Sequence, residues 1–248
     1  MIRIGLTVML AIFIAGRAQA GPAPTVQEVT RKLDDLYRSS ASIKRVELIS
    51  QTETQTRHLK LHAWTKGTDR SLIVIDEPAR EAGTATLKVG QNLWNYLPKI
   101  SRTIRIPPSM MLSSWMGTDF TNDDLVQDTS YEQDFDTPPG VPSSDPPGWL
   151  FTMTVKPGIV GRWQKIEWVV TSDTWLPEQA KYYDRKGRLA RTMRFTNIKT
   201  LGGRPIPTRM LLDSVDQPGH RTELEFLDAN FDAAVPDSTF SLSALERQ

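Results

Sequence analysis

The fold is decided by the second half of the chain, where short alternating segments follow one another: LFTMTV (150–155), QKIEWVVT (164–171), EQAKYYD (178–184), LARTMRFTNIK (189–199), IPTRMLLDSV (206–215) and TELEF (222–226). Alternation of apolar and polar residues with a period of two is typical of β-strands with one buried face. The connections are short and rich in turn residues, as at Gly202-Gly203. Strands joined in this way form an antiparallel meander.

The first half of the chain alternates as well. In two segments, Leu59, Leu61 and Ala63 oppose His58, Lys60, His62 and Trp64, and Ala85, Leu87 and Val89 oppose Thr84, Thr86 and Lys88. We expect the apolar sides of these strands to be buried and the polar sides to be exposed. Residues 72–75 are apolar on both sides, which predicts a strand that is covered twice or central in the sheet. About eleven strands in ~230 residues predict a mainly β fold, with a single curved antiparallel sheet that forms an open half-barrel.

Helices are expected to cover the concave face of this sheet. Residues 26–37 have apolar side chains at helical spacing, with Thr25 as N-cap and Glu28 three residues later. Residues 122–127 are predicted to form a second, short helix. The first helix and the segment at residues 109–117 are the expected covers, and together with the sheet they would enclose a ligand-sized space.

A proline-rich stretch interrupts the alternating pattern. Residues 137–148 contain five Pro and two Gly. Because Pro lacks a backbone N–H and Gly weakens regular elements, this composition predicts a long exposed loop without a regular element. The loop divides the sheet-forming chain but does not by itself indicate two domains.

The N-terminus has the features of a secretory signal peptide. Arg3 precedes an apolar stretch over residues 4–15, and Ala18-Gln19-Ala20 supplies a small-residue cleavage pattern. We expect a signal peptide at residues 1–20, cleavage after Ala20, and an exported single domain at residues 21–248. The chain has no Cys, so the mature protein is not expected to be a lipoprotein itself.

The charge of the chain is balanced. Residues 1–20 contain two Arg and no acid, so the mature chain has 28 basic and 29 acidic residues, a net charge of −1. Such a chain has no general electrostatic attraction for nucleic acid, and no nucleic-acid partner is expected. Lys99, Arg102 and Arg105 form a local basic group, which we interpret as the solvent side of a strand.

Motifs of the common enzyme classes are missing from the sequence. It contains no G-x-S-x-G elbow, no H-E-x-x-H helix, no phosphate-binding Gly loop and no Cys nucleophile. His58 and His62 are four residues apart, but along a strand this spacing corresponds to ~13 Å, too far for one metal ion. We therefore expect a non-enzymatic protein with no metal site and no cofactor.

Asp123 and Asp124 lie in the first turn of the predicted helix at residues 122–127. An acidic pair can perform acid–base catalysis, but a helix N-terminus also favours negative charge, and Thr121 or Asn122 would serve as the N-cap. We interpret both carboxylates as part of this helix start. Replacing both with Asn is expected to cost about 1 kcal/mol or less.

The candidate site lies in a Met- and Trp-rich segment. Three of the six Met residues of the mature chain lie within a stretch of seven positions, residues 110–116. Met has several rotatable bonds and a polarizable sulfur, which suits an adaptable apolar surface for a lipid-sized ligand; ordinary core packing is the alternative. A Leu112→Gln variant separates a cavity lid from a plain core. If the segment is a lid, the variant should mainly weaken binding of an acyl probe; if it is core, the variant should mainly lower the stability of the protein. The candidate binding or lid residues are Trp94, Met110, Met111, Leu112, Trp115, Met116, Phe120 and Trp168.

Several stretches together resemble the LolA-like outer-membrane lipoprotein-sorting proteins of Gram-negative bacteria, and more closely their uncharacterised branch than LolA itself. The resemblance rests on Leu93–Pro98, Arg102–Pro107, Ser113–Phe120, Asp123-Asp124-Leu125, Leu176-Pro177, Tyr182-Tyr183-Asp184 with Gly187, Ile206-Pro207 and Phe240–Leu245. It implies an open β-barrel with helices that plug its mouth and a cavity that shields acyl chains in the periplasm.

Two functions follow from this resemblance. The first is a periplasmic carrier, expected to be a monomer, that binds lipoprotein acyl chains or free lipids and passes them from an inner-membrane transporter toward an outer-membrane acceptor. The second is a sensor or adaptor that detects envelope lipids or proteins and regulates a membrane partner, or serves a lipid transporter. A carrier should co-purify with lipid, whereas a sensor should hold a protein partner.

Overall fold

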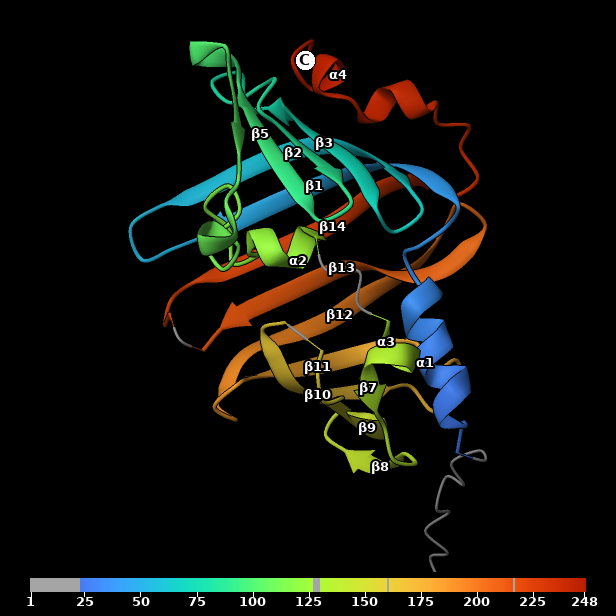
Figure 1. Ribbon diagram of the computed structural model, residues 1–248. Helices are drawn as coiled ribbons and strands as arrows, with labels where there is room; N and C mark the ends of the chain where they lie inside the picture. Colours follow the sequence, from blue (N-terminus) through green and yellow to red (C-terminus); the bar gives the residue numbers. More distant parts are fainter. Residues whose placement is uncertain (1–22, 127–129, 160, 216) are drawn as a thin grey trace, which may run out of the picture.

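Among the residues that the structure describes, 14 strands form one curved antiparallel sheet that does not close (Figure 1). The computed structural model describes residues 23–126, 130–159, 161–215 and 217–248, so the predicted signal peptide lies outside the described residues. The strands are β1 (Ala41–Gln51), β2 (Thr56–Lys66), β3 (Arg70–Glu77), β4 (Ala85–Val89), β5 (Asn92–Leu97), β6 (Arg102–Arg105), β7 (Phe135–Asp136), β8 (Val141–Ser144), β9 (Pro147–Val155), β10 (Trp163–Val170), β11 (Pro177–Asp184), β12 (Leu189–Leu201), β13 (Arg204–Ser214) and β14 (Arg221–Asn230). The predicted meander and half-barrel are therefore confirmed.

The sheet order is β6-β5-β4-β3-β2-β1-β14-β13-β12-β11-β10-β9-β7, with β8 paired to β9. The last strand, β14, pairs with β1 and so joins the two halves of the chain. Val46 of β1 lies opposite Leu61 of β2 and Phe226 of β14. Because directly opposed residues share a face, this register places all three on the concave side, where they join the main hydrophobic core.

Helical elements cover both faces of the sheet. They are α1 (Val26–Asp35), α2 (Asn122–Val126), α3 (Tyr131–Asp134), α4 (Leu242–Leu245) and the 3-10 turns η1 (Pro98–Ile100), η2 (Pro108–Met110) and η3 (Asp237–Phe240). The first three helices lie on the concave side, and α4 lies on the outside near β3 (Figure 1). Thr25 and Glu28 form the predicted capping box of α1: the Glu28 N–H donates to Thr25 Oγ1, and the Thr25 N–H donates to Glu28 Oε2.

Strands β3 and β4 are buried on both faces. Two buried faces were predicted for β3, and this is confirmed: Ile75 packs in the main core and Leu72 packs under the C-terminal segment. For β4 an exposed polar face was predicted, and this is wrong, because Thr86 and Lys88 are only 2% and 4% exposed. The C-terminal segment, with Phe240 and Leu245, covers the outer face with Leu87, and the polar face turns toward the interior of the half-barrel.

The proline-rich stretch contains a strand that the sequence did not predict. β8 lies within residues 137–148, and β9 begins at Pro147. Only β9 pairs with β8 in the described sheet, so β8 is an edge strand. At an edge, a residue without an N–H donor, such as Pro142, is tolerated.

No helix in the described part of the chain is both long and apolar enough to cross a membrane.

Candidate functional site

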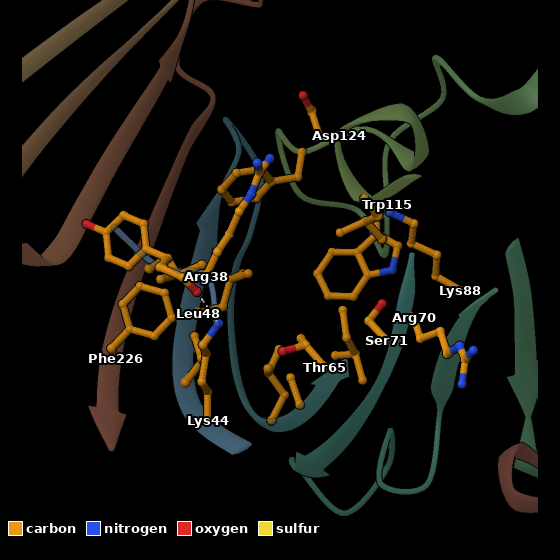
Figure 2. Close-up of a pocket in the computed structure, with 18 of the residues that line it drawn as sticks. Arg38, Lys44, Leu48, Thr65, Arg70, Ser71, Lys88, Trp115, Asp124 and Phe226 are labelled. Carbon is orange, nitrogen blue, oxygen red and sulfur yellow. Dashed lines mark hydrogen bonds between the residues drawn. The ribbon is translucent and has the colours of Figure 1, made fainter. Parts of the chain in front are cut away.

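A cavity of about 310 Å³ lies on the concave side of the sheet (Figure 2). It is lined by Tyr37, Arg38, Lys44, Val46, Leu48, Leu61, Ala63, Thr65, Gly67, Thr68, Arg70, Ser71, Ile73, Lys88, Trp115, Phe120, Asp124, Leu125, Leu224 and Phe226. Leu48 and Phe226 lie on one side of the space and Trp115 on the other (Figure 2). Strands β1, β2, β3 and β14 therefore supply the wall, and the segment before α2 supplies the cover.

The wall is apolar because of the strand register. Val46 and Leu48 of β1, Leu61 and Ala63 of β2 and Leu224 of β14 alternate with residues that point outward. Trp115, Phe120 and Leu125 add apolar surface from the opposite side. A concave apolar space of this size fits part of an acyl chain or another small apolar group.

The cover is a segment at residues 113–121, which we call the plug segment. Its Trp115 is 4% exposed, and the indole Nε1 donates to Thr86 Oγ1 of β4 at 3.0 Å. Ser50 of β1 donates through Oγ to the carbonyl of Gly117 at 2.9 Å. These hydrogen bonds connect the plug segment to β4 and β1, which are separated in the sheet by β3 and β2, and hold the indole against the cavity.

A second connection holds the plug segment to β14. The hydroxyl of Thr222 donates to Asp119 Oδ2 at 2.8 Å and accepts from the Asp119 N–H at 2.9 Å. Burial raises the pKa of the Asp119 carboxyl, and the hydrogen bond from Thr222 acts in the opposite direction. The plug segment is therefore bonded to β1, β4 and β14.

The turn of the plug segment requires glycine. Gly117 has φ +69°, and a Cβ there would lie 2.5 Å from Arg57 Nη1. The Arg57 guanidinium donates to the Met116 carbonyl and forms an ion pair with Glu81. A side chain at position 117 would displace this guanidinium, so the bend before Thr118 depends on the glycine.

Helix α2, which follows the plug segment, is attached to the opposite half of the sheet. The Asp124 carboxylate accepts two hydrogen bonds from Arg191 of β12, both at 2.9 Å. The Arg191 guanidinium lies 4.4 Å from the ring centroids of both Trp163 and Tyr182. Burial alone would raise the pKa of the Asp124 carboxyl, but the charge and hydrogen bonds of Arg191 outweigh burial and hold the pKa below its ordinary value.

The interpretation of the acidic pair was therefore incomplete. Asp124 does form the predicted helix start, because its carboxylate accepts from the Thr121 N–H at 2.8 Å while the Asp124 N–H donates to Thr121 Oγ1 at 3.2 Å. Thr121 is the capping residue. The same carboxylate also neutralises a buried Arg, so the expected cost of about 1 kcal/mol is too small for Asp124.

The lining of the cavity also includes basic side chains. Lys44 Nζ donates to the Tyr37 carbonyl at the end of α1 at 2.7 Å, and Lys88 Nζ donates to the Thr68 carbonyl at 2.5 Å. Arg38 also lines the cavity, and its Nη1 lies 3.6 Å from Asp34 Oδ1. Burial, together with the charge of Arg204, lowers the pKa of Lys44 to about 8.

The lowered pKa of Lys44 predicts a pH-dependent stability. The group has its ordinary pKa of 10.5 when exposed in the unfolded chain and a pKa of about 8 in the folded protein. Between these values the unfolded chain binds more protons, so the contribution of Lys44 to the free energy of unfolding rises with pH. We expect the wild type to gain stability relative to Lys44→Met between pH 8 and pH 10, measured by denaturant unfolding. A difference between the two proteins that stays constant over this range would contradict the burial of the ammonium.

The structure brings only part of the predicted site together. Trp115 and Phe120 line the cavity. Met116 packs on the main core, and Met111 packs against Leu93 and Ile106 in a separate cluster.

The other four candidates lie away from the cavity lining. Met110 and Leu112 are exposed, at 47% and 63%. Trp94 packs with the outer cluster under the C-terminal segment. Trp168 is buried in the far half of the core, with ring centroids 5.5 Å from Tyr131 and 5.4 Å from Phe195. The Leu112→Gln comparison therefore tests neither a lid nor a core.

Other sequence-based interpretations can be located in the structure. Lys99, Arg102 and Arg105 are exposed, as expected. His58 is exposed, and His62 Nδ1 lies 2.6 Å from Asp76 Oδ1. The cavity wall on β1 and β14 and the lining cations Lys44 and Lys88 were not predicted from the sequence. The alternating face with Leu61 and Ala63 was the available signal for that wall.

Comparisons with known proteins agree with this architecture. A family model described as that of an uncharacterised protein matches residues 67–247. No curated protein matches the chain in sequence.

Solved structures share the fold over most of their length. A DUF1329 family protein from Desulfovibrio piger has 25% identity and a TM-score of 0.76, covering 88% of this chain and 96% of that protein. A LolA superfamily protein from Nitrosomonas europaea has 24% identity and a TM-score of 0.73, covering 90% and 100%. A domain from Vibrio parahaemolyticus, assigned to outer membrane lipoprotein sorting, has 22% identity and a TM-score of 0.74, covering 89% and 97%. The chain therefore belongs to a DUF1329-like family of uncharacterised proteins, a branch of the LolA-like fold.

Proposed function

We propose that the mature protein, a single domain at residues 21–248, is a periplasmic carrier that holds lipoprotein acyl chains or free lipids in the cavity under the plug segment. The observation that carries this proposal is the apolar space between the strand wall and Trp115. Similarity in fold to a LolA superfamily protein and to a domain assigned to outer membrane lipoprotein sorting supports it. In this proposal the carrier acts as a monomer and receives its cargo from an inner-membrane transporter for delivery to an outer-membrane acceptor.

The energetics of such a cavity suit reversible binding. Burying one methylene contributes ~0.8 kcal/mol, so a long acyl chain supplies on the order of 10 kcal/mol of gross driving force. Transfer to an acceptor requires much weaker net binding. Because a cavity of about 310 Å³ is small beside a whole lipid, a long chain would have to displace contacts between the plug segment and the sheet. The lost contacts would lower the net affinity.

A binding role accounts for the chemistry of the lining better than a catalytic role. The lining carboxylate, Asp124, is engaged by Arg191, and the cavity wall is mainly aliphatic and aromatic. Lys44 and Lys88 hydrogen-bond main-chain carbonyls. In this arrangement the polar groups hold the surrounding chain segments and orient a bound ligand, while the apolar surface supplies the affinity for that ligand.

Native mass spectrometry of protein purified from the periplasm tests the proposal. The wild type is expected to carry a lipid mass in near-stoichiometric amount. An Ala63→Phe variant should lose most of this mass and bind an acyl probe at least tenfold more weakly, because the ring fills the space beside Leu61. A matched Ala79→Phe variant, at an exposed position outside the lining, should keep the lipid.

Two outcomes would overturn the carrier proposal. One is a wild type that carries no lipid and binds no acyl probe. The other is a stable adduct with a protein in place of a lipid, which would favour the sensor or adaptor. If Ala63→Phe and Ala79→Phe lost equal amounts of bound lipid, the cavity would not be the lipid-binding site.

A further inference from the structure

Exposed apolar side chains are concentrated at the free edge of the sheet beyond β5. Strand β6 pairs with β5 and is the last strand on that side of the described sheet. Residues 98–112, which we call the edge segment, contain η1, β6 and η2 and lie at this edge (Figure 1). Among the described residues, four of the ten exposed large apolar side chains belong to this segment: Ile100, Ile104, Met110 and Leu112, with exposed fractions of 58%, 43%, 47% and 63%.

The edge segment also carries positive charge. Its Lys99, Arg102 and Arg105 are exposed, and in the described part of the chain none of them forms an ion pair with a carboxylate. The Arg105 guanidinium donates to the neutral side chain of Asn92. Residues 82–118 contain no Asp or Glu. The exposed surface of the edge segment is therefore both apolar and cationic.

The register places these side chains on both sides of β6. Thr103 Oγ1 donates at 2.7 Å to Glu246 Oε1 of the C-terminal segment, so the side that Thr103 shares with Arg105 is the outer face of the sheet. Because successive residues of a strand point to opposite faces, Arg102 and Ile104 lie on the concave side. A broad surface that approaches the open edge would meet cations from both faces together with Ile104.

The end of the edge segment is fixed by the elements around it. Met111 packs inward in a buried cluster, whereas Met110 and Leu112 on either side of it are exposed. Asn122 Nδ2 donates to the Met110 carbonyl at 3.0 Å, and the Asp123 N–H donates to the Met111 carbonyl at 2.8 Å. The start of α2 therefore holds this turn, and the exposed side chains lie directly before the plug segment.

We infer that the edge segment docks on an anionic lipid surface, with Lys99, Arg102 and Arg105 beside the head groups and the exposed apolar side chains inserted among them. Lys and Arg near such a surface are attracted to its negative charge, and apolar side chains gain free energy when the interface buries them. The inference goes beyond the proposed function, because it does not require a ligand in the cavity.

A protective role of the cations explains only part of this surface. Charged side chains on an edge strand prevent strand pairing between copies of a protein, which would account for Arg102 and Arg105. It would not account for Ile104 in the same strand, or for Met110 and Leu112. Single exposed apolar residues are common, whereas several together mark an interaction site. The mature chain has a net charge of −1, so attraction to an anionic surface has to come from a local group such as this one.

Sedimentation of the mature protein with lipid vesicles tests the inference. At pH 7 and low salt, we expect at least tenfold stronger partitioning to phosphatidylcholine vesicles that contain about one-third phosphatidylglycerol than to phosphatidylcholine alone. The preference should fall as salt is raised to about 0.3 M, because salt screens exposed charges. Equal partitioning to the two kinds of vesicle, or none to either, would overturn the inference and leave the carrier proposal standing.

A charge variant locates the docking surface. Lys99→Gln combined with Arg102→Gln should weaken partitioning to the anionic vesicles at least tenfold, since each cation near the surface contributes about fivefold. The matched control is Arg45→Gln combined with Lys186→Gln, which removes two exposed cations outside the edge segment. It should keep the wild-type partitioning within about threefold. Equal losses in the two double variants would show that net charge, and not the edge segment, controls binding.

An apolar variant tests the second component of the surface. Ile100→Ser combined with Leu112→Ser should weaken partitioning at least fivefold, because two side chains available for insertion are lost. Ile198→Ser combined with Leu227→Ser, at exposed positions outside the edge segment, should have little effect. All four side chains are exposed, so thermal unfolding should show that both variants remain folded. Wild-type partitioning in both the charge and the apolar variants of the edge segment would overturn the inference.

Ala63→Phe separates docking at the edge from binding in the cavity. This variant should partition to the anionic vesicles as the wild type does, whether or not it still holds an acyl probe. Partitioning that is lost in Ala63→Phe and kept in the edge variants would place the attachment at the cavity and overturn the inference. A concentration-dependent dimer without vesicle binding, abolished by Lys99→Gln with Arg102→Gln, would assign the edge to a second copy of the chain and would also overturn it.

Discussion

An Asp124→Asn variant is expected to lose about 3–5 kcal/mol of unfolding free energy. The substitution keeps the shape of the side chain but removes the counter-charge of Arg191, whose side chain is 8% exposed. The guanidinium would remain buried between Trp163 and Tyr182 without a carboxylate. Leaving one member of a buried pair uncompensated is much more costly than losing a surface ion pair.

Denaturant unfolding of three variants at pH 7 checks this prediction. Asp123→Asn is the matched control, because Asp123 lies in the same turn and pairs with no cation in the described structure; it should lose less than about 1 kcal/mol. Asp124→Asn with Arg191→Met should recover part of the loss, since no buried charge remains. Equal losses for Asp123→Asn and Asp124→Asn would show that the pair with Arg191 contributes nothing.

The pH dependence of the same variants provides a second check. Arg191 holds the pKa of Asp124 below its ordinary value, so this carboxylate stabilises the fold above the pKa of the unfolded chain, about 4. The stabilisation is lost as the pH falls through the lower, folded pKa. The difference in stability between wild type and Asp124→Asn should therefore shrink in acid.

Local sequence patterns predicted most of the fold. The strands β9 to β14 appear where residues alternate, because a period of two leaves one face to bury regardless of the partner strand. The start of α1 was predictable from Thr25 and Glu28, which interact within a single turn. The face of β4 was not predictable in this way. Both faces of that strand are buried, and the outer one is covered by the C-terminal segment, about 150 residues later in the sequence.

The candidate site was harder to predict because it depends on contacts between distant segments. Asp124 and Arg191 are 67 residues apart, and no local pattern connects them. The Met-rich composition drew attention to residues 110–116, but it did not distinguish Trp115, which faces the cavity, from Leu112, which faces solvent. Those two are three residues apart in an irregular segment, where no periodicity assigns a face.

The second large effect is expected at Trp115. A Trp115→Ala variant should lose about 3–5 kcal/mol of unfolding free energy, because it removes a buried indole and leaves a cavity. It also leaves Thr86 without its hydrogen bond from Nε1. Leu112→Ala, just before the plug segment, is the control; at an exposed position it should lose no more than about 0.5 kcal/mol.

The same variant tests whether the indole borders the binding space or only core. If Trp115 borders the space, its removal enlarges an apolar cavity, and an acyl probe should still bind to the folded variant and stabilise it more than it stabilises the wild type. Thermal unfolding with and without the probe measures this difference. If the probe stabilises the wild type but not Trp115→Ala, the plug segment is needed to form the site rather than to cover it. A loss below about 1 kcal/mol would instead show that the plug segment is not anchored through this indole.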